Sequence, residues 1–234
     1  MKHPIDQYLE RYAEPEAQLR QQLSSRFRQV VVVPAYDEPP EFAQEMLSTL
    51  GPDVFVIVVV NVPDNVSPRD EMHQRSKRLL QDLAAPNLLT VDRVNRPIPR
   101  KQGVGLARKI GADVALGYIR DGTIAEPYIY SVDADVQLPS GYVPAIEREE
   151  GAYLYSYRHE STDPEVLRRA QLYELHMRHY VAGLRLAGSP YAFHTLGSTI
   201  SVSATAYAQV RGFPRRDAAE DFYFLNKLSK VSKI

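Results

Sequence analysis

Four short segments of the chain consist almost entirely of β-branched, aromatic and other apolar residues, without the polar alternation of a half-exposed strand. They are residues 29–34, 54–60, 87–91 and 128–132, and the second reads VFVIVVV. A continuous apolar run of this length predicts a strand buried on both faces, as in a parallel sheet. Because helices must cover both faces of such a sheet, no other feature of the sequence constrains the fold as strongly.

Helical periodicity fills the intervals between these predicted strands. Pro39 and Pro40 are suited to open a first helix that ends at Gly51, and Ser67-Pro68 resembles the start of a second. The inward positions of the three predicted helices are Phe42, Met46, Leu47 and Leu50; Leu79, Leu80 and Leu83; and Leu106, Ile110 and Val114. Alternation of strand and helix over roughly 29–135 predicts a doubly wound α/β unit.

The remainder of the chain has a mixed pattern. Residues 151–158 and 199–203 are predicted strands, a long helix is expected from Asp163-Pro164 to Leu186, and a last helix begins near Ala219. Residues 1–28 show helical spacing interrupted by a proline. We therefore expect a helical extension over 1–28 and one α/β domain over 29–234.

The composition of the 234-residue chain is that of a globular protein, with 44% hydrophobic and 24% charged residues. A formal net charge of −1 gives no support to nucleic-acid binding, and the absence of cysteine excludes disulfides. The N-terminal residues lack the apolar core of a signal peptide, and the longest apolar run is too short to cross a bilayer. These features predict a cytoplasmic protein without a transmembrane segment, and they leave contact with the inner face of the membrane open.

Polar residues follow the predicted strands at the edge of the sheet where α/β proteins bind ligands. The first strand runs into Pro34-Ala35-Tyr36-Asp37-Glu38, and the second ends at Asn61, with Asp64 close behind. The fourth ends at Asp133-Ala134-Asp135. In an extended segment residues two apart point the same way, so both carboxylates are expected to face one cavity. Two carboxylates are suitable ligands for a Mg²⁺ or Mn²⁺ ion that also binds the oxygens of a diphosphate.

Each of these features also has a purely structural interpretation. An isolated D-x-D sequence often consists of solvated turn residues, and Tyr36 has the position of a core aromatic at a strand end. The Glu220-Asp221 pair lies in the first turn of a predicted helix, where acidic residues favour the helix dipole. The six histidines form no cluster with the spacing of a zinc site.

The order of the motifs adds a further indication. VVVPAYDE, KQGVGLARKIGA (101–112), SVDAD, GSTISVS, RGFP and AEDFYFLNKL follow one another along the chain. Taken together, residues 29–230 resemble glycosyltransferase family 2, which has the GT-A fold. That resemblance implies a mostly parallel central sheet flanked by helices, and an enzyme that transfers a sugar from a nucleotide-diphosphate donor such as a UDP- or GDP-sugar.

The resemblance also implies roles for individual residues. Asp135, with Asp133, would hold Mn²⁺ or Mg²⁺, and Asp221, beside Glu220, would act as the catalytic base of an inverting transfer. Gly197 and Ser198 would lie near the donor sugar and the acceptor. The residues implied in nucleotide binding are Pro34, Ala35, Tyr36, Glu38, Asn61, Asp64, Lys101, Arg108, Asp133 and Ala134.

Three departures from the family pattern affect these expectations. The second strand ends in Asn61-Val62 where the family usually has two aspartates, so the base is left open between uracil and guanine. Lys109 replaces the usual asparagine after Arg108. Family members also usually continue beyond the helix of Asp221, so a C-terminally truncated domain is expected.

Two other functions fit the same residues. A phosphatase of the haloacid dehalogenase type also has an apolar strand that enters D-x-D, here Asp133 and Asp135. A catalytically silent GT-A-like scaffold that binds a sugar or a partner is the second alternative. For the transferase itself, retention at the anomeric carbon is the alternative to inversion, and the acceptor is unknown.

Overall fold

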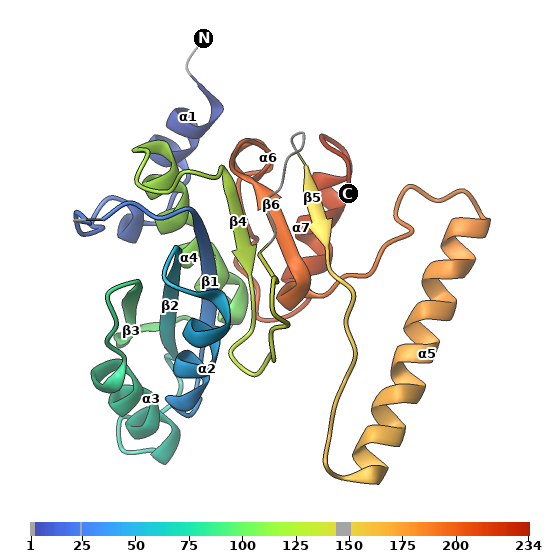
Figure 1. The fold of residues 1–234 in the computed structure, drawn as a ribbon, viewed down its shortest axis with the longest axis horizontal. Coiled ribbons are helices and arrows are strands. Elements are labelled where there is room, and N and C mark those ends of the chain that lie inside the picture. Colours follow the sequence, from blue (N-terminus) through green and yellow to red (C-terminus); the bar gives the residue numbers. More distant parts are fainter. Residues whose placement is uncertain (1–2, 24, 144–150) are drawn as a thin grey trace.

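A computed structural model of the protein describes residues 3–23, 25–143 and 151–234. Its described residues form a six-stranded sheet in the order β3-β2-β1-β4-β6-β5 (Figure 1). The strands are β1 (Gln29–Ala35), β2 (Val54–Pro63), β3 (Leu88–Ile98), β4 (Tyr128–Ser131), β5 (Ala152–Leu154) and β6 (Ile200–Ser203). The first four strands are parallel, whereas β6 runs antiparallel to both β4 and β5. The protein is therefore α/β with a mostly parallel sheet, as the apolar runs predict.

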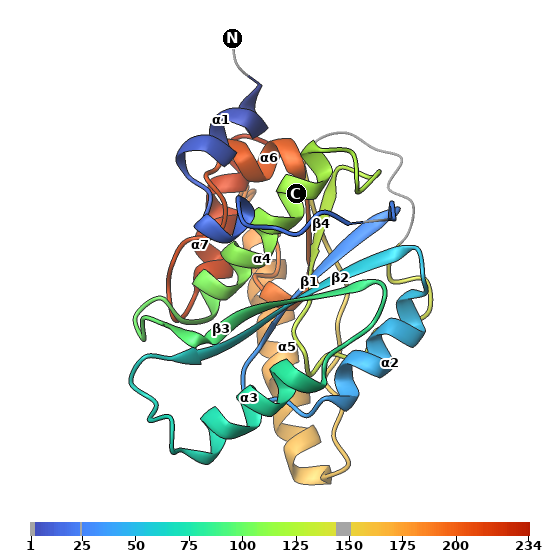
Figure 2. The ribbon, with the colours of Figure 1, turned by 90° about the vertical axis from the view of Figure 1, so that its left-hand side faces the viewer.

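Helices cover both faces of this sheet. On one face lie α2 (Glu41–Leu50) and α3 (Glu71–Asp82), and on the other α4 (Gly103–Arg120), with α6 (Ala204–Gln209) and α7 (Glu220–Leu228) beside it (Figure 2). The remaining helical elements are α1 (Pro4–Arg11), α5 (Pro164–Leu186) and two short 3₁₀ turns, η1 (Pro15–Ala17) and η2 (Gly197–Thr199). This arrangement places two apolar layers around the central strands.

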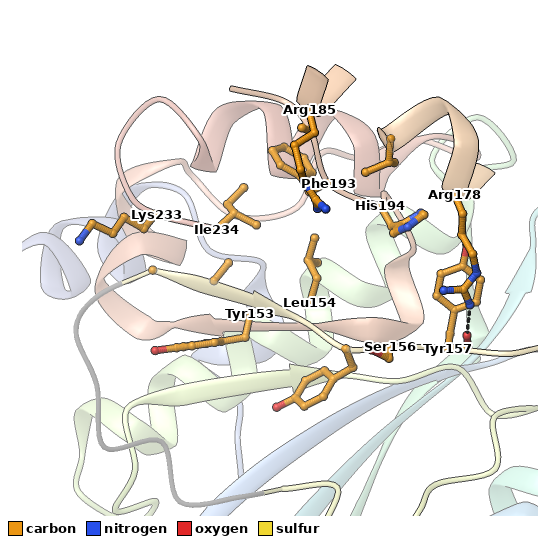
Figure 3. Close-up of a pocket in the computed structure, with 15 residues that line it drawn as sticks. Tyr153, Leu154, Ser156, Tyr157, Arg178, Arg185, Phe193, His194, Lys233 and Ile234 are labelled. Atoms are coloured by element: carbon orange, nitrogen blue, oxygen red, sulfur yellow. Dashed lines mark hydrogen bonds between the residues drawn. The ribbon is translucent and has the colours of Figure 1, made fainter. Parts of the chain in front are cut away.

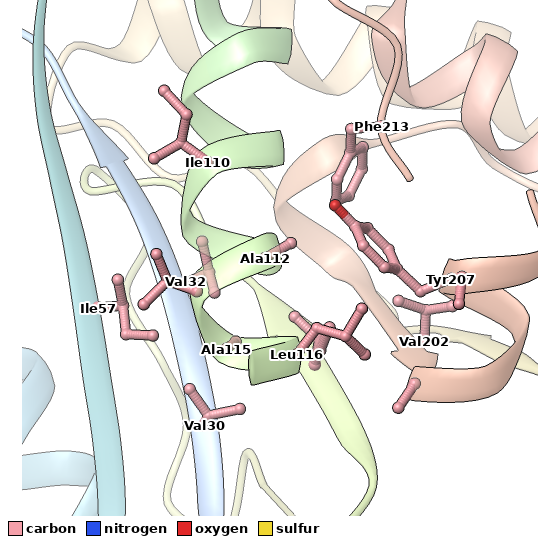
Figure 4. Packing of buried hydrophobic residues seen from close by; sticks show 14 of the residues in the cluster. Val30, Val32, Ile57, Ile110, Ala112, Ala115, Leu116, Val202, Tyr207 and Phe213 are labelled. Atoms are coloured by element: carbon pink, nitrogen blue, oxygen red, sulfur yellow. The ribbon is translucent and has the colours of Figure 1, made fainter. Parts of the chain in front are cut away.

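Alternate residues of β1 enter these two layers. Val31 and Val33 pack against α2 and α3, whereas Val30 and Val32 face α4 (Figure 4). All four side chains are at most 1% exposed, and full burial of a valine stabilises the fold by about 1.5–3 kcal/mol. Gly111 lets α4 approach the sheet, because a Cβ there would lie 2.3 Å from Val32 Cγ1.

The N-terminal residues contribute to the same core. Helix α1 packs on α4 and α6, and its Tyr8 is 1% exposed. The Tyr8 hydroxyl donates to Asp113 of α4 at 2.6 Å, and Tyr207 of α6 donates to the same carboxylate at 2.7 Å. Lys109 Nζ also contacts Asp113, at 2.8 Å. The segment predicted as an extension is thus anchored to the α/β unit by buried polar contacts.

Several predicted boundaries are correct and others are wrong. Helices α2 and α5 begin and end close to the predicted residues, and α7 begins close to its predicted start. Asp163 caps α5 by accepting from two backbone N–H groups. Helix α3 begins at Glu71 after Asp70, not at Ser67-Pro68. Ser67 only forms a turn, because its hydroxyl accepts a hydrogen bond from the backbone N–H of Arg69.

Two apolar segments also differ from their prediction. Only Ala152–Leu154 of the expected strand 151–158 forms a strand, and residues 19–23 and 25–27 do not continue the first helix. Leu19 is 70% exposed, so its helical spacing has no apolar surface to face.

Helix α5 stands beside the sheet rather than on it (Figure 1). Val181 is its one buried residue, and Leu172, Leu175 and Leu186 are at least half exposed. Among the described helices, none combines the length and the apolar composition needed to cross a membrane.

Candidate functional site

The shared direction of the parallel strands brings the carboxyl ends of β1 and β4 to one edge of the sheet. The first turn of α4 and the 3₁₀ turn η2 lead to the same place, as does the start of α7. Arg108 of α4 is the side chain that joins these elements. Its guanidinium donates to Asp133 after β4 and to Glu220 at the start of α7.

This arginine is deeply buried. Arg108 and Glu220 are each 4% exposed, whereas the side chain of Asp133 retains 35% exposure. The guanidinium also lies directly against Gly197, where a Cβ would come within 2.3 Å of Nη1. Gly197 is therefore required by the close approach of the arginine, and four segments that are distant in the sequence meet at one guanidinium.

The two aspartates of the D-x-D sequence have different environments. The chain leaves the extended conformation after β4, and Ala134 and Asp135 lie in a turn. The strand alternation on which the prediction for the two carboxylates rested therefore does not extend to Asp133 and Asp135. Asp133 is held by Arg108, Ala134 is buried, and Asp135 is exposed to solvent.

Glu38 connects the end of β1 with this acidic turn. Burial raises the pKa of Glu38, and the negative charges of Asp135, Asp37 and Asp133 raise it further. Electrostatic coupling to both aspartates means that the three carboxylates belong to one acidic region. A cation near them would relieve their mutual repulsion.

The residues before Glu38 are fixed by α3. Asp37 has a left-handed backbone with φ of 61°, and Arg75 of α3 donates to its two carboxylate oxygens at 2.6 and 2.7 Å. The Tyr36 hydroxyl donates to Met72 Sδ at 3.5 Å, and its ring is half-buried. Pro34 and Ala35 are buried in β1. Tyr36 thus lies at the rim of the site, supported by α3 rather than inserted in the core.

Asn61 and Asp64 have structural hydrogen bonds. The Asn61 side-chain amide donates to the carbonyls of Ala35 and Val59 at 3.0 and 3.2 Å, and so joins β1 to β2. Asp64 accepts from the backbone N–H of Arg100 at 2.9 Å and is exposed. Strand β2 continues past Asn61 to Pro63, so the predicted end at Asn61 is two residues early, and Asp64 directly follows the strand.

The glycines near the start of α4 allow the loop after α6 to pack directly against the helix. The Gly105 N–H donates to the Arg216 carbonyl at 2.9 Å, and a Cβ on Gly105 would lie 2.4 Å from the Pro214 carbonyl oxygen. This contact joins the KQGVG and RGFP motifs in space. Lys101, just before the helix, is exposed, whereas Arg108 is already engaged by two carboxylates.

The acidic pair at the start of α7 divides into a buried and an accessible member. Glu220 is buried against Arg108, and Asp221 is half-buried and accepts from the Phe222 N–H at 2.7 Å. Ser198 follows Gly197 in η2 and is also half-buried. Asp221 is therefore the carboxylate of this pair that a ligand can reach.

The site offers oxygen ligands for a hard cation, but it is not a complete side-chain cage. Within residues 3–23, 25–143 and 151–234, no group of three His, Asp or Glu side chains is arranged to hold a metal ion. Asp135 is the accessible carboxylate, and Asp133 is shared with Arg108. A cation would therefore fit here only with further oxygens from a ligand or water, as Mg²⁺ sites commonly have.

Sequence reasoning missed the polar partners that hold the site together. It assigned Arg108 to nucleotide binding, but gave no reason to pair it with Glu220, which is 112 positions away. The contact of Arg75 with Asp37 was also not anticipated. Lys109, an unexpected residue in its motif, faces Asp113 and Tyr8 on the opposite side from the site.

The fold and the site together define an α/β protein, compatible with a Rossmann-like fold, with an acidic region bridged by arginine at the carboxyl edge of its sheet. Comparison of the chain with models of protein families finds no match, and a search of curated proteins finds none either.

Proposed function

We propose that the protein is a GT-A-type glycosyltransferase that transfers a sugar from a nucleotide-diphosphate donor. The meeting of Asp133, Glu220 and Gly197 at the Arg108 guanidinium carries this proposal. These residues come from separate motifs of the family 2 resemblance, and a transferase must bring such motifs to one place. The additional contact between Gly105 and Arg216 supports the same arrangement.

The nucleotide would lie at the carboxyl ends of β1 and β2. The half-buried ring of Tyr36 offers an apolar face for a base, and Glu38 is placed toward the acidic turn. Lys101 is exposed beside the start of α4 and can approach a diphosphate. Arg108 supports the site instead by fixing Asp133 and Glu220.

Asp135, together with Asp133, would hold Mn²⁺ or Mg²⁺, and phosphate oxygens would complete the coordination. When bound, this ion supplies positive charge to the leaving diphosphate. The acidic region fits such an ion, because Asp135 is exposed and Glu38 is influenced by both aspartates.

Asp221 would accept the proton of the acceptor hydroxyl. The acceptor oxygen forms a bond to the sugar C1 while the bond from C1 to the diphosphate oxygen breaks, and the proton passes to the Asp221 carboxylate. Glu220 is a positioning residue in this scheme, because it contacts Arg108 and not the substrate. A single displacement of this kind inverts the anomeric carbon.

Calorimetry with UDP and GDP, with and without Mn²⁺, tests the binding step. Asp135→Ala should abolish the Mn²⁺-dependent part of binding without unfolding the chain, because the residue is exposed. Asp82→Ala is the matched control, since this exposed carboxylate ends α3 at the opposite side of the parallel sheet. Equal affinity for wild type and Asp135→Ala would remove the metal assignment.

Transfer is tested separately by incubation with UDP- and GDP-sugars and analysis of the released nucleotide. Asp221→Asn should preserve donor binding and slow transfer by about 10²–10⁴-fold, the usual contribution of a general base. A variant that transfers at the wild-type rate contradicts the role of Asp221. The anomer of the product, read by NMR, separates inversion from retention.

A catalytically silent nucleotide-binding scaffold is the second candidate. It is favoured by one observation, that Arg108 already occupies an oxygen of Asp133. Nucleotide binding that is independent of Mn²⁺ and unaffected by Asp135→Ala, without sugar release, would support this candidate over the transferase.

A further inference from the structure

A cavity of about 640 Å³ lies between α5 and the β5 edge of the sheet (Figure 3). One wall is α5, which contributes Arg178, Val181 and Arg185. The opposite wall is β5 with the residues that follow it, and residues 192–194 and 233–234 close the ends. Its volume is within the range of small-molecule sites, and no residue of the candidate active site lines it.

The cavity is basic. The side chains of Arg178 and Arg185 line it, and none of its described lining residues is Asp or Glu. Arg178 is partly neutralised, because it donates to Glu174 at 3.1 Å and to the Tyr157 carbonyl at 2.8 Å. The side chain of Arg185 makes no hydrogen bond or ion pair with any described residue, and in Figure 3 it lies near Phe193 and His194. An anion would give this charge a partner.

Two buried polar atoms of the cavity lack a partner among the described residues. They are Nδ1 of His194 and the hydroxyl oxygen of Tyr157, whose rings meet edge to face at 5.5 Å. Buried polar atoms in native proteins are nearly always hydrogen-bonded, to protein, to water or to a ligand. Unpartnered atoms from two walls of a basic cavity are an observation independent of its charge.

The electrostatic state of His194 agrees with this geometry. Burial lowers the pKa of His194, and the nearby charges of Arg178 and Arg185 on α5 lower it further. Tyr157 faces the imidazole from the segment after β5, whereas the amino group of Lys233 points away from His194 in Figure 3. A bound anion would offset the positive charge of both arginines, so it should raise the pKa of His194.

We propose that this cavity binds a small organic anion, a phosphate monoester or carboxylate attached to an aromatic or aliphatic body. The anion lies between Arg185 and His194, and the body lies against Leu154, Val181 and Phe193. The mixture of basic and apolar lining suits a ligand with both parts better than inorganic phosphate. The proposal is independent of the transferase function, although residue 194 is only three positions before Gly197.

The test uses the full chain and phenyl phosphate as the probe, with the imidazole signal of His194 followed by NMR. Comparison with His194→Gln assigns that signal. Saturable binding is expected with a dissociation constant on the order of 1 mM or lower. At saturation the pKa of His194 should rise by about one pH unit, since a nearby opposite charge favours the protonated form.

Two arginines of α5 provide a matched pair of variants. Arg185→Gln should weaken phenyl phosphate binding at least roughly tenfold, because a hydrogen bond to a charged group is stronger than one between neutral groups. Arg169→Gln should leave the affinity unchanged, since Arg169 is exposed near the other end of the helix and pairs with Glu165. Phenol and inorganic phosphate, which lack the charge and the body respectively, should each bind more weakly than phenyl phosphate.

The proposal is overturned if phenyl phosphate and benzoate leave the His194 signal unchanged throughout the titration. It is also overturned if both arginine variants weaken binding equally, because the attraction would then be a property of the whole helix surface. Circular dichroism of each variant verifies that α5 and the sheet are intact.

Discussion

Replacing Arg108 by methionine would leave a buried carboxylate without its partner. Glu220 is 4% exposed, and the arginine is its only described hydrogen-bond partner through the side chain. Removing one member of a buried pair typically costs about 3–5 kcal/mol, since the remaining charge keeps its desolvation penalty. We therefore expect Arg108→Met to lower the free energy of unfolding by about this amount at pH 7.

The loss should depend on pH in a defined direction. In the variant, burial without a cation raises the pKa of Glu220 in the folded state above its value in the unfolded chain. The folded state then binds more protons than the unfolded state, so the variant loses stability as the pH rises from the pKa of Glu220 in the unfolded chain to its pKa in the folded chain. The difference from wild type should accordingly be largest at neutral pH and smaller near pH 4, below the ordinary pKa of about 4.3 for glutamate.

A double-mutant cycle isolates the pair. Arg108→Met with Glu220→Leu removes both charges and fills the space with apolar atoms, a replacement that is often neutral for buried pairs. The double variant should therefore lose less than the sum of the single variants, by about 2 kcal/mol or more. Asp133 remains hydrated in all variants, because its side chain is 35% exposed.

Urea unfolding followed by circular dichroism measures these differences, provided that the slope m is the same for each variant. If Arg108→Met costs less than about 1 kcal/mol, the typical value for an exposed pair, the buried bridge does not exist in solution. Additive losses in the double variant would lead to the same conclusion, and the convergence that carries the proposed function would have to be abandoned.

Three further outcomes can be measured in the same way. Gly111→Ala should destabilise the protein by about 1–3 kcal/mol, because the added Cβ collides with Val32. Gly183→Ala, on the open surface of α5, should instead stabilise it by about 0.5–1 kcal/mol. Equal effects of the two variants in urea unfolding would contradict the close contact of α4 with β1. Asp113→Ala should lower the free energy of unfolding by more than about 3 kcal/mol, because it removes the acceptor of four hydrogen bonds, from Tyr8, Tyr207, Lys109 and the Glu14 backbone. Asp6→Ala removes only an exposed contact with Arg120 and should lower it by at most about 1 kcal/mol. The prediction fails if the two losses are similar. Glu38→Gln should stabilise the protein at neutral pH and lose this advantage below the ordinary carboxylate pKa. The reason is that a pKa of Glu38 raised in the folded state makes the stability of the wild type fall as the pH rises. A difference in melting temperature that does not depend on pH would exclude the electrostatic coupling of Glu38 to the neighbouring aspartates.

The sequence predicted the strands and helices well where one physical signal dominates. Continuous apolar runs at 29–34 and 54–60 are buried on both faces because only a covered sheet removes both sides from water. Asp163-Pro164 marked the start of α5 because a capping carboxylate and a fixed proline φ act within one turn. The same local reasoning misplaced α3, since Ser67 and Asp70 are both suitable capping residues and Asp70 is the one at the N-cap position, although its side chain makes no capping hydrogen bond.

The candidate site was predicted in its location but not in its organisation. The carboxyl ends of parallel strands share one edge, so strand prediction alone brings Glu38 near Asp133 and Asp135. The turn after β4, the burial of Glu220 and the engagement of Arg108 depend on contacts between residues more than 20 positions apart. Local sequence contains no information about which carboxylate a buried arginine will reach.

Periodicity and chain order by themselves thus determined a mostly parallel α/β sheet with polar residues at its carboxyl edge. Tertiary structure alone decided that Asp135 stays exposed while Asp133 is held, and that the first helix belongs to the core. It also created the basic cavity beside α5, from segments whose composition is unremarkable one by one. The physical reason is that burial and charge pairing are properties of neighbours in space, whereas propensity and apolar periodicity are properties of neighbours along the chain.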